Sequence, residues 1–301
     1  MNIEDGRTFT LRVGGTEVRT FYYQVGTPTR GDVVAMHTGG VGVSAYMCWY
    51  LTLDALAREG YRVTAPDAPG FGRSVVTEGE HIAGTEFLLA LMDALDLERA
   101  HLIGNSMGSM TISKFAVQHP QYVESLVLSG GEPRITTDAL REIGSLAATP
   151  RNNFVRTMFA DHAVNQQNLR IATADFFHDR AHPTIDHVAD LRRQTLADEG
   201  VYRRAEEGVV RQLERKSSDT DTTYLSEIAV PVFLLHGRDE SWFYPNQHRD
   251  ALTDAAMKAA KVIPNCTTTF LPFCGHWPQL ESADRYNALV GEFLKTLAPS
   301  R

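Results

Sequence analysis

The pentapeptide Gly104-Asn105-Ser106-Met107-Gly108 stands between a short apolar run and a helix-length segment, and it restricts the fold more than any other feature. The apolar run His101-Leu102-Ile103 is typical of a buried strand, and residues 107–119 favour a helix. A strand that turns this sharply into a helix brings backbone segments close together, which the two glycines permit. We therefore expect Ser106 at a tight turn beside a helix N-terminus, where free N–H groups favour developing negative charge.

The rest of the chain alternates short apolar runs with helix-length segments, which predicts a mostly parallel sheet with crossover helices. Before this alternation, residues 8–26 form two β-rich runs around Gly14-Gly15, a pattern that predicts a hairpin. The expected buried strands are 33–36, 62–65, 101–103, 126–128, 232–235 and 267–271, and the expected helices are 45–59, 84–95, 107–119, 251–261 and 283–297.

The interval from about residue 132 to residue 226 interrupts the alternation, because it has no convincing strand and many helix-compatible polar residues. We interpret it as a helical cap inserted into a core domain made of residues 1–131 and 227–301. Arginines and acids are interspersed along it, which favours a solvated surface over a basic binding patch.

Composition excludes several classes of protein. The formal net charge of −8 makes nucleic acid an unsuitable partner. The sequence contains no apolar run long enough to span a membrane and no apolar leader, so we expect a cytoplasmic protein. Three scattered cysteines predict neither a disulfide framework nor a metal site, and the chain has no phosphate-binding glycine motif for a cofactor. We therefore expect no cofactor and no metal.

A serine hydroxyl needs a base, and His276 is the best of the eleven histidines. It lies in a loop between the last predicted strand and the last predicted helix, where it can reach the edge of the sheet beside Ser106. Asp239 follows the predicted strand 232–235 and is the expected acid that orients the imidazole, with the neighbouring Glu240 as the alternative. Serine, acid and histidine then occur in the chain order of a known hydrolase arrangement.

An oxyanion hole is the fourth expected element. The segment His37-Thr38-Gly39-Gly40-Val41-Gly42 follows the strand that ends at Met36. The backbone N–H of Met107 and one from Gly39 or Gly40 would hold the oxyanion.

Three motifs together resemble the α/β-hydrolase superfamily: the pentapeptide around Ser106, the turn Asp67-Ala68-Pro69-Gly70-Phe71-Gly72-Arg73-Ser74, and Gly275-His276-Trp277-Pro278-Gln279-Leu280-Glu281. Within it the chain is most similar to meta-cleavage-product hydrolases, which split a carbon–carbon bond in 2-hydroxy-6-oxo-dienoates during aromatic catabolism. The resemblance covers the core well and the cap poorly, and it implies an α/β fold with a mostly parallel, eight-stranded sheet flanked by helices.

The resemblance also assigns substrate contacts. Asn105 and Trp277 match positions that shape the pocket of that group, and Arg192, with Arg193 as the alternative, matches a cap arginine that binds the substrate carboxylate. An arginine suits this task because its planar fork pairs bidentately with a carboxylate. Two departures stand out: Thr38 and Val41 interrupt the glycine run, and Cys48 occupies the place of a pocket asparagine.

These observations predict a cofactor-independent serine hydrolase that acts on a small molecule, with the ring-fission products as the first substrate class. A carboxylesterase or lactonase is the alternative that Cys48 favours. A small-molecule receptor or a cofactor-free oxygenase on the same fold is a second alternative. Membranes are not expected as partners, and a homodimer remains open because dimers are common among soluble proteins.

Overall fold

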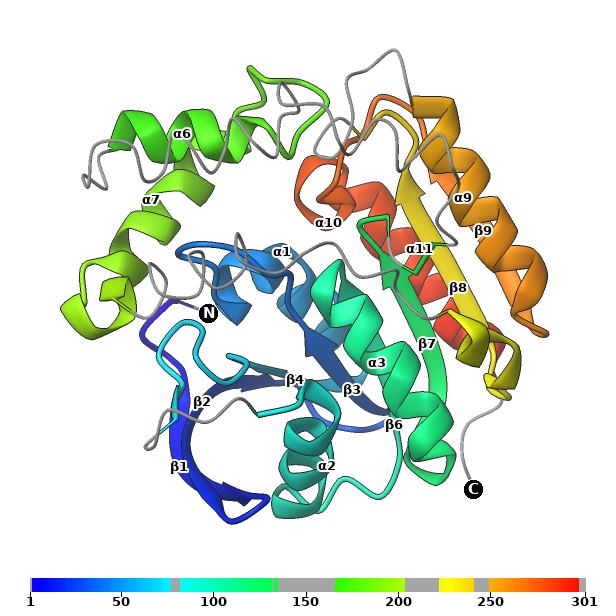
Figure 1. The fold of residues 1–301 in the computed structure, drawn as a ribbon, viewed down its shortest axis with the longest axis horizontal. Coiled ribbons are helices and arrows are strands. Elements are labelled where there is room, and N and C mark those ends of the chain that lie inside the picture. Colours follow the sequence, from blue (N-terminus) through cyan, green and yellow to red (C-terminus); the bar gives the residue numbers. More distant parts are fainter. Residues whose placement is uncertain are drawn as a thin grey trace.

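The computed structural model describes residues 2–76, 82–131, 133–134, 166–203, 222–240 and 249–297. Its centre is a nine-stranded sheet in the order β1-β2-β4-β3-β6-β7-β8-β9, in which the two-residue β5 pairs with β2 (Figure 1). The pairs of β2 with β1, β4 and β5 are antiparallel, and all other pairs are parallel. The strands are β1 (Arg7–Val13), β2 (Thr16–Val25), β3 (Gly31–Met36), β4 (Tyr61–Pro66), β5 (Val75–Val76), β6 (Ala100–Asn105), β7 (Val123–Ser129), β8 (Val232–Gly237) and β9 (Cys266–Leu271).

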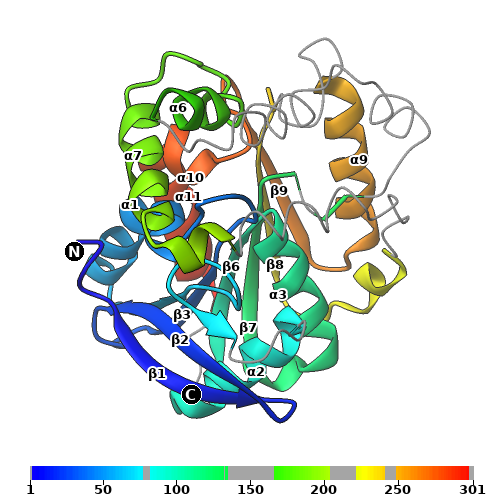
Figure 2. The ribbon, with the colours of Figure 1, turned by 60° about the vertical axis from the view of Figure 1, so that its left-hand side comes forward.

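Residue alternation along the strands explains how both faces of the sheet are buried. In β3, Val33 and Ala35 join one hydrophobic cluster and Val34 and Met36 join the other, as the two-residue period of a strand requires. The first cluster includes side chains of α1 and α11, and the second includes side chains of α2, α3 and α9. Helices therefore cover both faces, which is the arrangement expected for parallel strands (Figures 1 and 2).

The predicted core segments are confirmed. Each expected strand and helix is present, and its observed ends lie within a few residues of the predicted ones. The N-terminal hairpin is also confirmed. The four-residue α10 and the short β5 were not predicted. The helices are α1 (Ala45–Arg58), α2 (Gly84–Ala94), α3 (Met107–Gln118), α6 (Gln166–Ala174), α7 (Thr184–Leu196), α9 (Arg249–Val262), α10 (Pro278–Glu281) and α11 (Ala283–Thr296), with 3₁₀ turns η1 (Pro120–Tyr122) and η2 (Thr223–Glu227).

Two helices, α6 and α7, lie within the interval predicted as a cap. They pack against each other, and α7 also contacts α1 in the core (Figures 1 and 2). Much of the predicted cap lies outside the described residues, so the boundaries 132 and 226 stay a prediction. Within the described ranges, no helix is long and apolar enough to cross a membrane.

Candidate active site

Ser106 lies at a strained turn between β6 and α3. Its φ of 53° is in the left-handed region, which a non-glycine residue adopts at a cost. A Cβ atom at Gly104 would lie 2.5 Å from Ser109 N, and one at Gly108 would lie 2.1 Å from Met36 O. Both contacts are with backbone, so neither glycine can carry a side chain without moving the chain. The turn predicted from the pentapeptide is therefore present.

The two sides of the predicted oxyanion hole lie next to each other. A Cβ atom at Gly39 would come within 3.4 Å of Met107 Sδ, so the loop after β3 packs against the start of α3. Met107 is the first residue of α3, and the N–H of a first helical residue has no carbonyl partner one turn earlier. Gly40 has a φ of 132°, which explains why glycine stands there. The roles of Met107, Gly39 and Gly40 as oxyanion donors stay a prediction that this placement allows.

His37 fixes the loop after β3. Ala68 N–H donates to its Nε2 at 2.9 Å, so the proton is on Nδ1, which donates to Thr38 O at 2.6 Å. Burial lowers the pKa of His37 to about 4, so the ring is neutral at pH 7. His37 thereby ties the glycine loop to the turn after β4.

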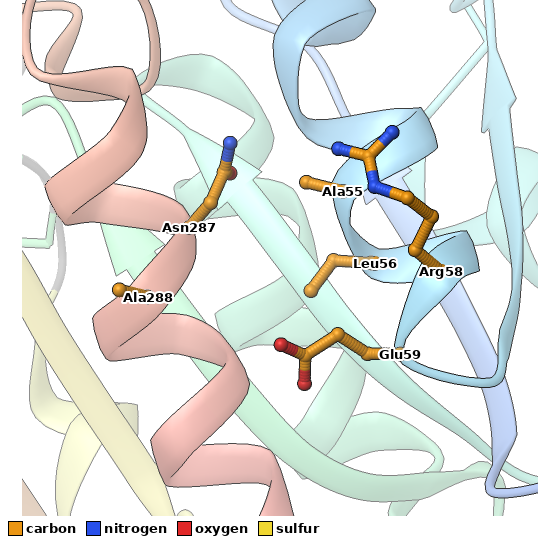
Figure 3. A pocket seen from close by; sticks show the side chains of 6 residues that line it. All are labelled: Ala55, Leu56, Arg58, Glu59, Asn287 and Ala288. Atoms are coloured by element: carbon orange, nitrogen blue, oxygen red, sulfur yellow. The ribbon is translucent and has the colours of Figure 1, made fainter.

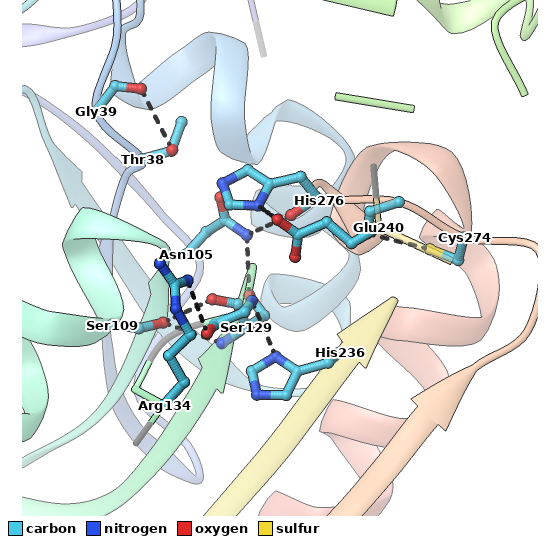
Figure 4. Close-up of polar contacts among 12 residues, drawn as sticks. Thr38, Gly39, Asn105, Ser109, Ser129, Arg134, His236, Glu240, Cys274 and His276 are labelled. Atoms are coloured by element: carbon cyan, nitrogen blue, oxygen red, sulfur yellow. Dashed lines mark hydrogen bonds and ion pairs between the residues drawn. The ribbon is translucent and has the colours of Figure 1, made fainter. Parts of the chain in front are cut away.

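His276 occupies the loop between β9 and α10, as predicted. Its Nδ1–H donates to Glu240 Oε1 at 2.7 Å, and each of the two side chains is only 1% exposed. Figure 4 shows the carboxylate of Glu240 against the His276 ring. Burial alone raises the pKa of Glu240, but the charge and the hydrogen bond of His276, with the charge of Arg134, hold that pKa below its ordinary value. Glu240 is therefore the ionised carboxylate that orients the imidazole.

The prediction that Asp239 orients His276 is wrong in this structure. Asp239 Oδ2 instead accepts a hydrogen bond from Phe273 N–H at 2.7 Å and lies 3.2 Å from Arg238 Nη2. Phe273 has a φ of 54°, so Asp239 stabilises a strained turn before the histidine. Two carboxylates follow β8 in succession, and the longer side chain of Glu240, one position later, reaches Nδ1. The alternative considered from the sequence is the one that the geometry supports.

A second buried histidine, His236, lies on β8 near the Glu240 carboxylate (Figure 4). Gly131 N–H donates to its Nδ1 at 3.2 Å, which leaves the proton on Nε2. Burial lowers the pKa of His236 to about 4, so this ring adds no positive charge at neutral pH. His236 was not predicted as a site residue, although its place at the end of a buried strand could have indicated it.

Asn105 links the serine turn to the histidine loop. Its Nδ2 lies within hydrogen-bond distance of Ser129 Oγ (3.2 Å), His276 O (3.2 Å) and Gln279 Oε1 (3.3 Å), and it has two hydrogens to donate. Its Oδ1 is buried with no hydrogen-bond partner among the described residues. Asn105 therefore presents an unused acceptor next to Ser106, consistent with the predicted place at the pocket.

Cys48, on α1, continues this network. Gln279 Nε2–H donates to Cys48 Sγ at 3.3 Å, so the cysteine is joined through Gln279 to Asn105. Burial raises the pKa of Cys48 to about 12, and the thiol is neutral at pH 7. Gln279 belongs to the motif around His276, but no role in the site was predicted for it; it joins Asn105 to Cys48.

Trp277 is fully buried beneath the first residues after α6. Its ring stacks on Phe176 with centroids 4.0 Å apart and planes 10° apart, and Phe177 meets it edge-on. Its Nε1–H is buried without a partner among the described residues. Phe176 and Phe177 thus pack on the residue that follows His276.

The two candidate cap arginines differ completely in environment. Arg192 is fully buried, and its Nε and Nη2 both donate to Val41 O, at 3.0 and 2.9 Å. Its Nη1 donates to Thr173 Oγ1 at 3.0 Å. Arg193 points outward and pairs with Asp190 at 2.7 Å. Of the two, Arg192 is the one next to the loop after β3, where the oxyanion hole is predicted. Burial lowers its pKa to about 9, so it is still cationic at neutral pH.

Two surface depressions lie away from these residues. One of about 290 Å³ lies between α1 and α11, where Glu59 pairs with Lys295 (Figure 3). Another of about 490 Å³ lies between the β1–β2 hairpin and α7. The described residues contain no cluster of three or more His, Cys, Asp or Glu side chains placed to hold a metal.

Comparison with known proteins identifies the class. The model of the family described as alpha/beta hydrolase fold matches residues 32–283, and the chain belongs to this family. Within it, the chain is an enzyme of the hydrolase class, and its similarity is to hydrolases of ring-fission products, as the motifs predicted.

Three similar proteins illustrate this. A 2-hydroxy-6-oxononadienedioate/2-hydroxy-6-oxononatrienedioate hydrolase of Paraburkholderia phymatum is 31% identical, over 93% of this chain and 92% of that protein. A 2-hydroxy-6-oxo-6-phenylhexa-2,4-dienoate hydrolase of Comamonas testosteroni is 28% identical, over 87% of each chain. The solved structure of a serine-to-alanine mutant of a meta-cleavage product hydrolase from Pseudomonas fluorescens superposes with a TM-score of 0.76, at 26% identity, over 99% of this chain and 100% of that one.

Proposed function

We propose that this enzyme is a cofactor-independent serine hydrolase that cleaves a carbon–carbon bond in 2-hydroxy-6-oxo-dienoate substrates. The observation that carries the proposal is the buried His276–Glu240 pair, held by Asn105 against the strained turn of Ser106. The names of the similar proteins supply the substrate class.

The chemistry follows from the residue types. His276 Nε2 would take the proton from Ser106 or from a water, and the resulting oxygen nucleophile would attack the C6 carbonyl of the substrate. The Met107 and Gly39 or Gly40 amides would stabilise the oxyanion, and Glu240 would stabilise the imidazolium. Cleavage of C5–C6 leaves its electron pair on C5. Ketonisation of the dienol beforehand makes this possible, because the C2 carbonyl can then accept that electron pair through the double bond. His276 would return its proton to the departing fragment. Where Ser106 is the nucleophile, a water that His276 deprotonates would then attack the acyl-enzyme, which releases the carboxylic acid and returns the proton to Ser106.

Two buried polar atoms, one on the residue before Ser106 and one on the residue after His276, support an oxygen-rich substrate. Asn105 Oδ1 and Trp277 Nε1 are a buried acceptor and a buried donor without partners among the described residues. A buried polar atom without a partner costs about 1–3 kcal/mol, which a bound ligand can recover. Arg192 supplies a buried cation beside the oxyanion loop, as a substrate carboxylate requires.

Cys48 favours one alternative, a carboxylesterase or lactonase. A neutral thiol in contact with Gln279 offers a dienoate less hydrogen bonding than the family's asparagine at this place. An ester needs only the nucleophile, the base and the oxyanion donors.

The proposal can be tested by burst kinetics of wild type and of Ser106→Ala. Both proteins would be measured with p-nitrophenyl esters and with a 2-hydroxy-6-oxo-dienoate. Dienoate turnover well above ester turnover, abolished in the variant, is the expected result. Ester turnover alone would support the alternative. If neither substrate reacts and Ser106→Ala changes nothing, the assignment of Ser106 is wrong.

A further inference from the structure

Glu281, the last residue of α10, is a buried carboxylate that holds two segments distant in sequence. Its Oε2 accepts hydrogen bonds from Gly275 N–H at 2.6 Å and from His178 N–H at 3.0 Å. Its Oε1 accepts a hydrogen bond from Asp179 N–H at 2.8 Å. The residue is 9% exposed, so these three bonds are formed largely out of water, where hydrogen bonds to a charged acceptor are strongest.

One of the two segments contains the proposed base. Gly275 immediately precedes His276, and the backbone N–H of His276 donates to Phe176 O at 2.8 Å. A Cβ atom at Gly275 would lie 2.5 Å from the same Phe176 oxygen. The histidine loop therefore lies directly on residues 176–179, the segment that follows α6. The backbone of Gly275 is in direct contact with the backbone of this segment.

The other segment, residues 176–179, belongs to the interval predicted as a cap, so it could shift relative to the core if it were not attached. Phe176 stacks on Trp277, and its ring centroid is 5.5 Å from that of His276. Stacked rings can slide, and the His276–Phe176 bond holds the segment at one residue only, whereas the three bonds to Glu281 fix the backbone at Gly275, His178 and Asp179. Glu281 also lies near His182, whose charge acts on it, and near Cys274.

We propose that Glu281 is a positioning residue: its carboxylate fastens residues 176–179 to the histidine loop and thereby holds His276 at the distance from Ser106 that proton transfer needs. Glu281 does not touch the reacting atoms in this proposal. It rests on the proposed function, because it assumes that His276 is the base. A displacement of about 1 Å in a catalytic group can cost about 100-fold in rate, so a backbone anchor of this kind affects catalysis directly.

Replacement of Glu281 by glutamine and by alanine removes different numbers of the three hydrogen bonds. A glutamine can keep its carbonyl oxygen on Gly275 N–H and His178 N–H, but its NH₂ group would then face Asp179 N–H. An alanine loses all three bonds. A fluorophosphonate probe reports on the base without the natural substrate, because Ser106 Oγ bonds to phosphorus, fluoride leaves, and His276 takes the proton. The maximal rate of labelling should fall about 10-fold in Glu281→Gln and about 100-fold in Glu281→Ala, while the concentration of probe for half-maximal rate changes by no more than about twofold.

Asp175→Asn is the matched control. Asp175 is another buried carboxylate beside the same segment, and it pairs with Arg180 at 2.5 Å without a hydrogen bond to the histidine loop. Its replacement should lower thermal stability as Glu281→Gln does, yet leave the labelling rate at the wild-type value. Equal labelling of wild type and Glu281→Gln, or an equal loss in Asp175→Asn, would overturn the inference and leave the proposed function intact. Failure of wild type to label at Ser106 would overturn both.

Discussion

Glu240 and Asp239 are adjacent carboxylates that contact different parts of the same loop. Glu240 accepts the Nδ1–H of His276, while Asp239 accepts Phe273 N–H three residues earlier in that loop. A carboxylate on Nδ1 fixes the tautomer of the ring and stabilises the imidazolium that forms when the base takes a proton. Glu240 therefore orients the proposed base, and Asp239 stabilises the turn that presents it.

Substitution of Glu240 by glutamine should lower kcat by about 1,000-fold, because the neutral amide can still accept the hydrogen bond but no longer balances the imidazolium charge. KM should change little, since Glu240 is buried behind His276. Steady-state kinetics on the better of the two substrate classes would measure both constants.

Asp239→Asn is the control for that experiment. The amide oxygen of asparagine can still accept Phe273 N–H, so kcat should stay within about tenfold of wild type. If Asp239→Asn instead abolished turnover and Glu240→Gln did not, Asp239 would be the orienting carboxylate, as the sequence first indicated.

At the scale of elements, close backbone contacts determine where glycine is required. Gly108 is the clearest case, because an added Cβ would lie 2.1 Å from Met36 O and 2.8 Å from His37 O. Overpacking usually costs about 1–3 kcal/mol, and the cost is higher where the contacted backbone cannot move, so Gly108→Ala should destabilise the protein by about 3 kcal/mol or more, or prevent folding. Urea unfolding of the purified variant would measure it.

Gly14→Ala provides the comparison, because a Cβ there meets nothing within 4 Å and only the φ of 56° is unfavourable. Its expected cost is about 1–2 kcal/mol, the usual penalty for a left-handed residue with a side chain. A Gly108→Ala variant no less stable than Gly14→Ala would contradict the close packing of α3 against β3.

The loop after β3, which contains the proposed oxyanion donors, is held by α7 as well as by His37. The fork of Arg192 chelates Val41 O, and a Cβ at Gly42 would lie 3.0 Å from Arg192 O. Arg192→Met should therefore slow turnover of a neutral p-nitrophenyl ester about 10-fold, because a loosened loop positions its donors poorly. An arginine that served only to bind a substrate carboxylate would leave this ester reaction unchanged. The exposed Arg193→Met is the matched control, and kcat on the neutral ester decides between the two outcomes.

The core elements were predictable from sequence because most of the buried strands contain a short apolar or β-branched run and each crossover helix has its own length and boundaries. Residues 232–235 and 45–59 are examples, recovered as β8 and α1 with small changes at their ends. The four residues of α10 are too few for a periodic pattern to indicate a helix. The choice between Asp239 and Glu240 failed because the period of a strand no longer applies beyond its end, so sequence does not tell which side chain turns toward the histidine.

At the scale of the whole molecule, buried titratable groups link stability to pH. The pKa values of His37 and His236 are lowered by burial to about 4, from an ordinary value of 6.5. Between these values the unfolded chain binds protons that the folded chain does not, so stability rises with pH. Each histidine should therefore remove about 3 kcal/mol of stability as the pH falls from above 6.5 to below 4.

Asp67 acts in the opposite direction. Its carboxylate accepts Ala45 N–H at 2.6 Å and Arg73 N–H at 2.8 Å, yet burial raises its pKa from 3.8 to about 6. The folded protein therefore binds this proton more tightly than the unfolded chain. Its contribution is fully present below the unfolded pKa and is lost as the pH rises through about 6. Asp67 thus offsets part of the loss of stability in acid caused by the two histidines.

Asp67→Asn isolates this effect, because an asparagine at this place does not titrate. The variant loses one of the two acceptors at every pH, so it should be less stable than wild type throughout. The difference in free energy of unfolding between wild type and variant should grow by about 2 kcal/mol from about pH 7.5 to about pH 4.5, since only wild type gains from protonation. Urea titrations at several pH values would measure the difference. A difference that stays constant with pH would mean that Asp67 keeps an ordinary pKa in the folded protein, and that its two hydrogen bonds compensate fully for its burial.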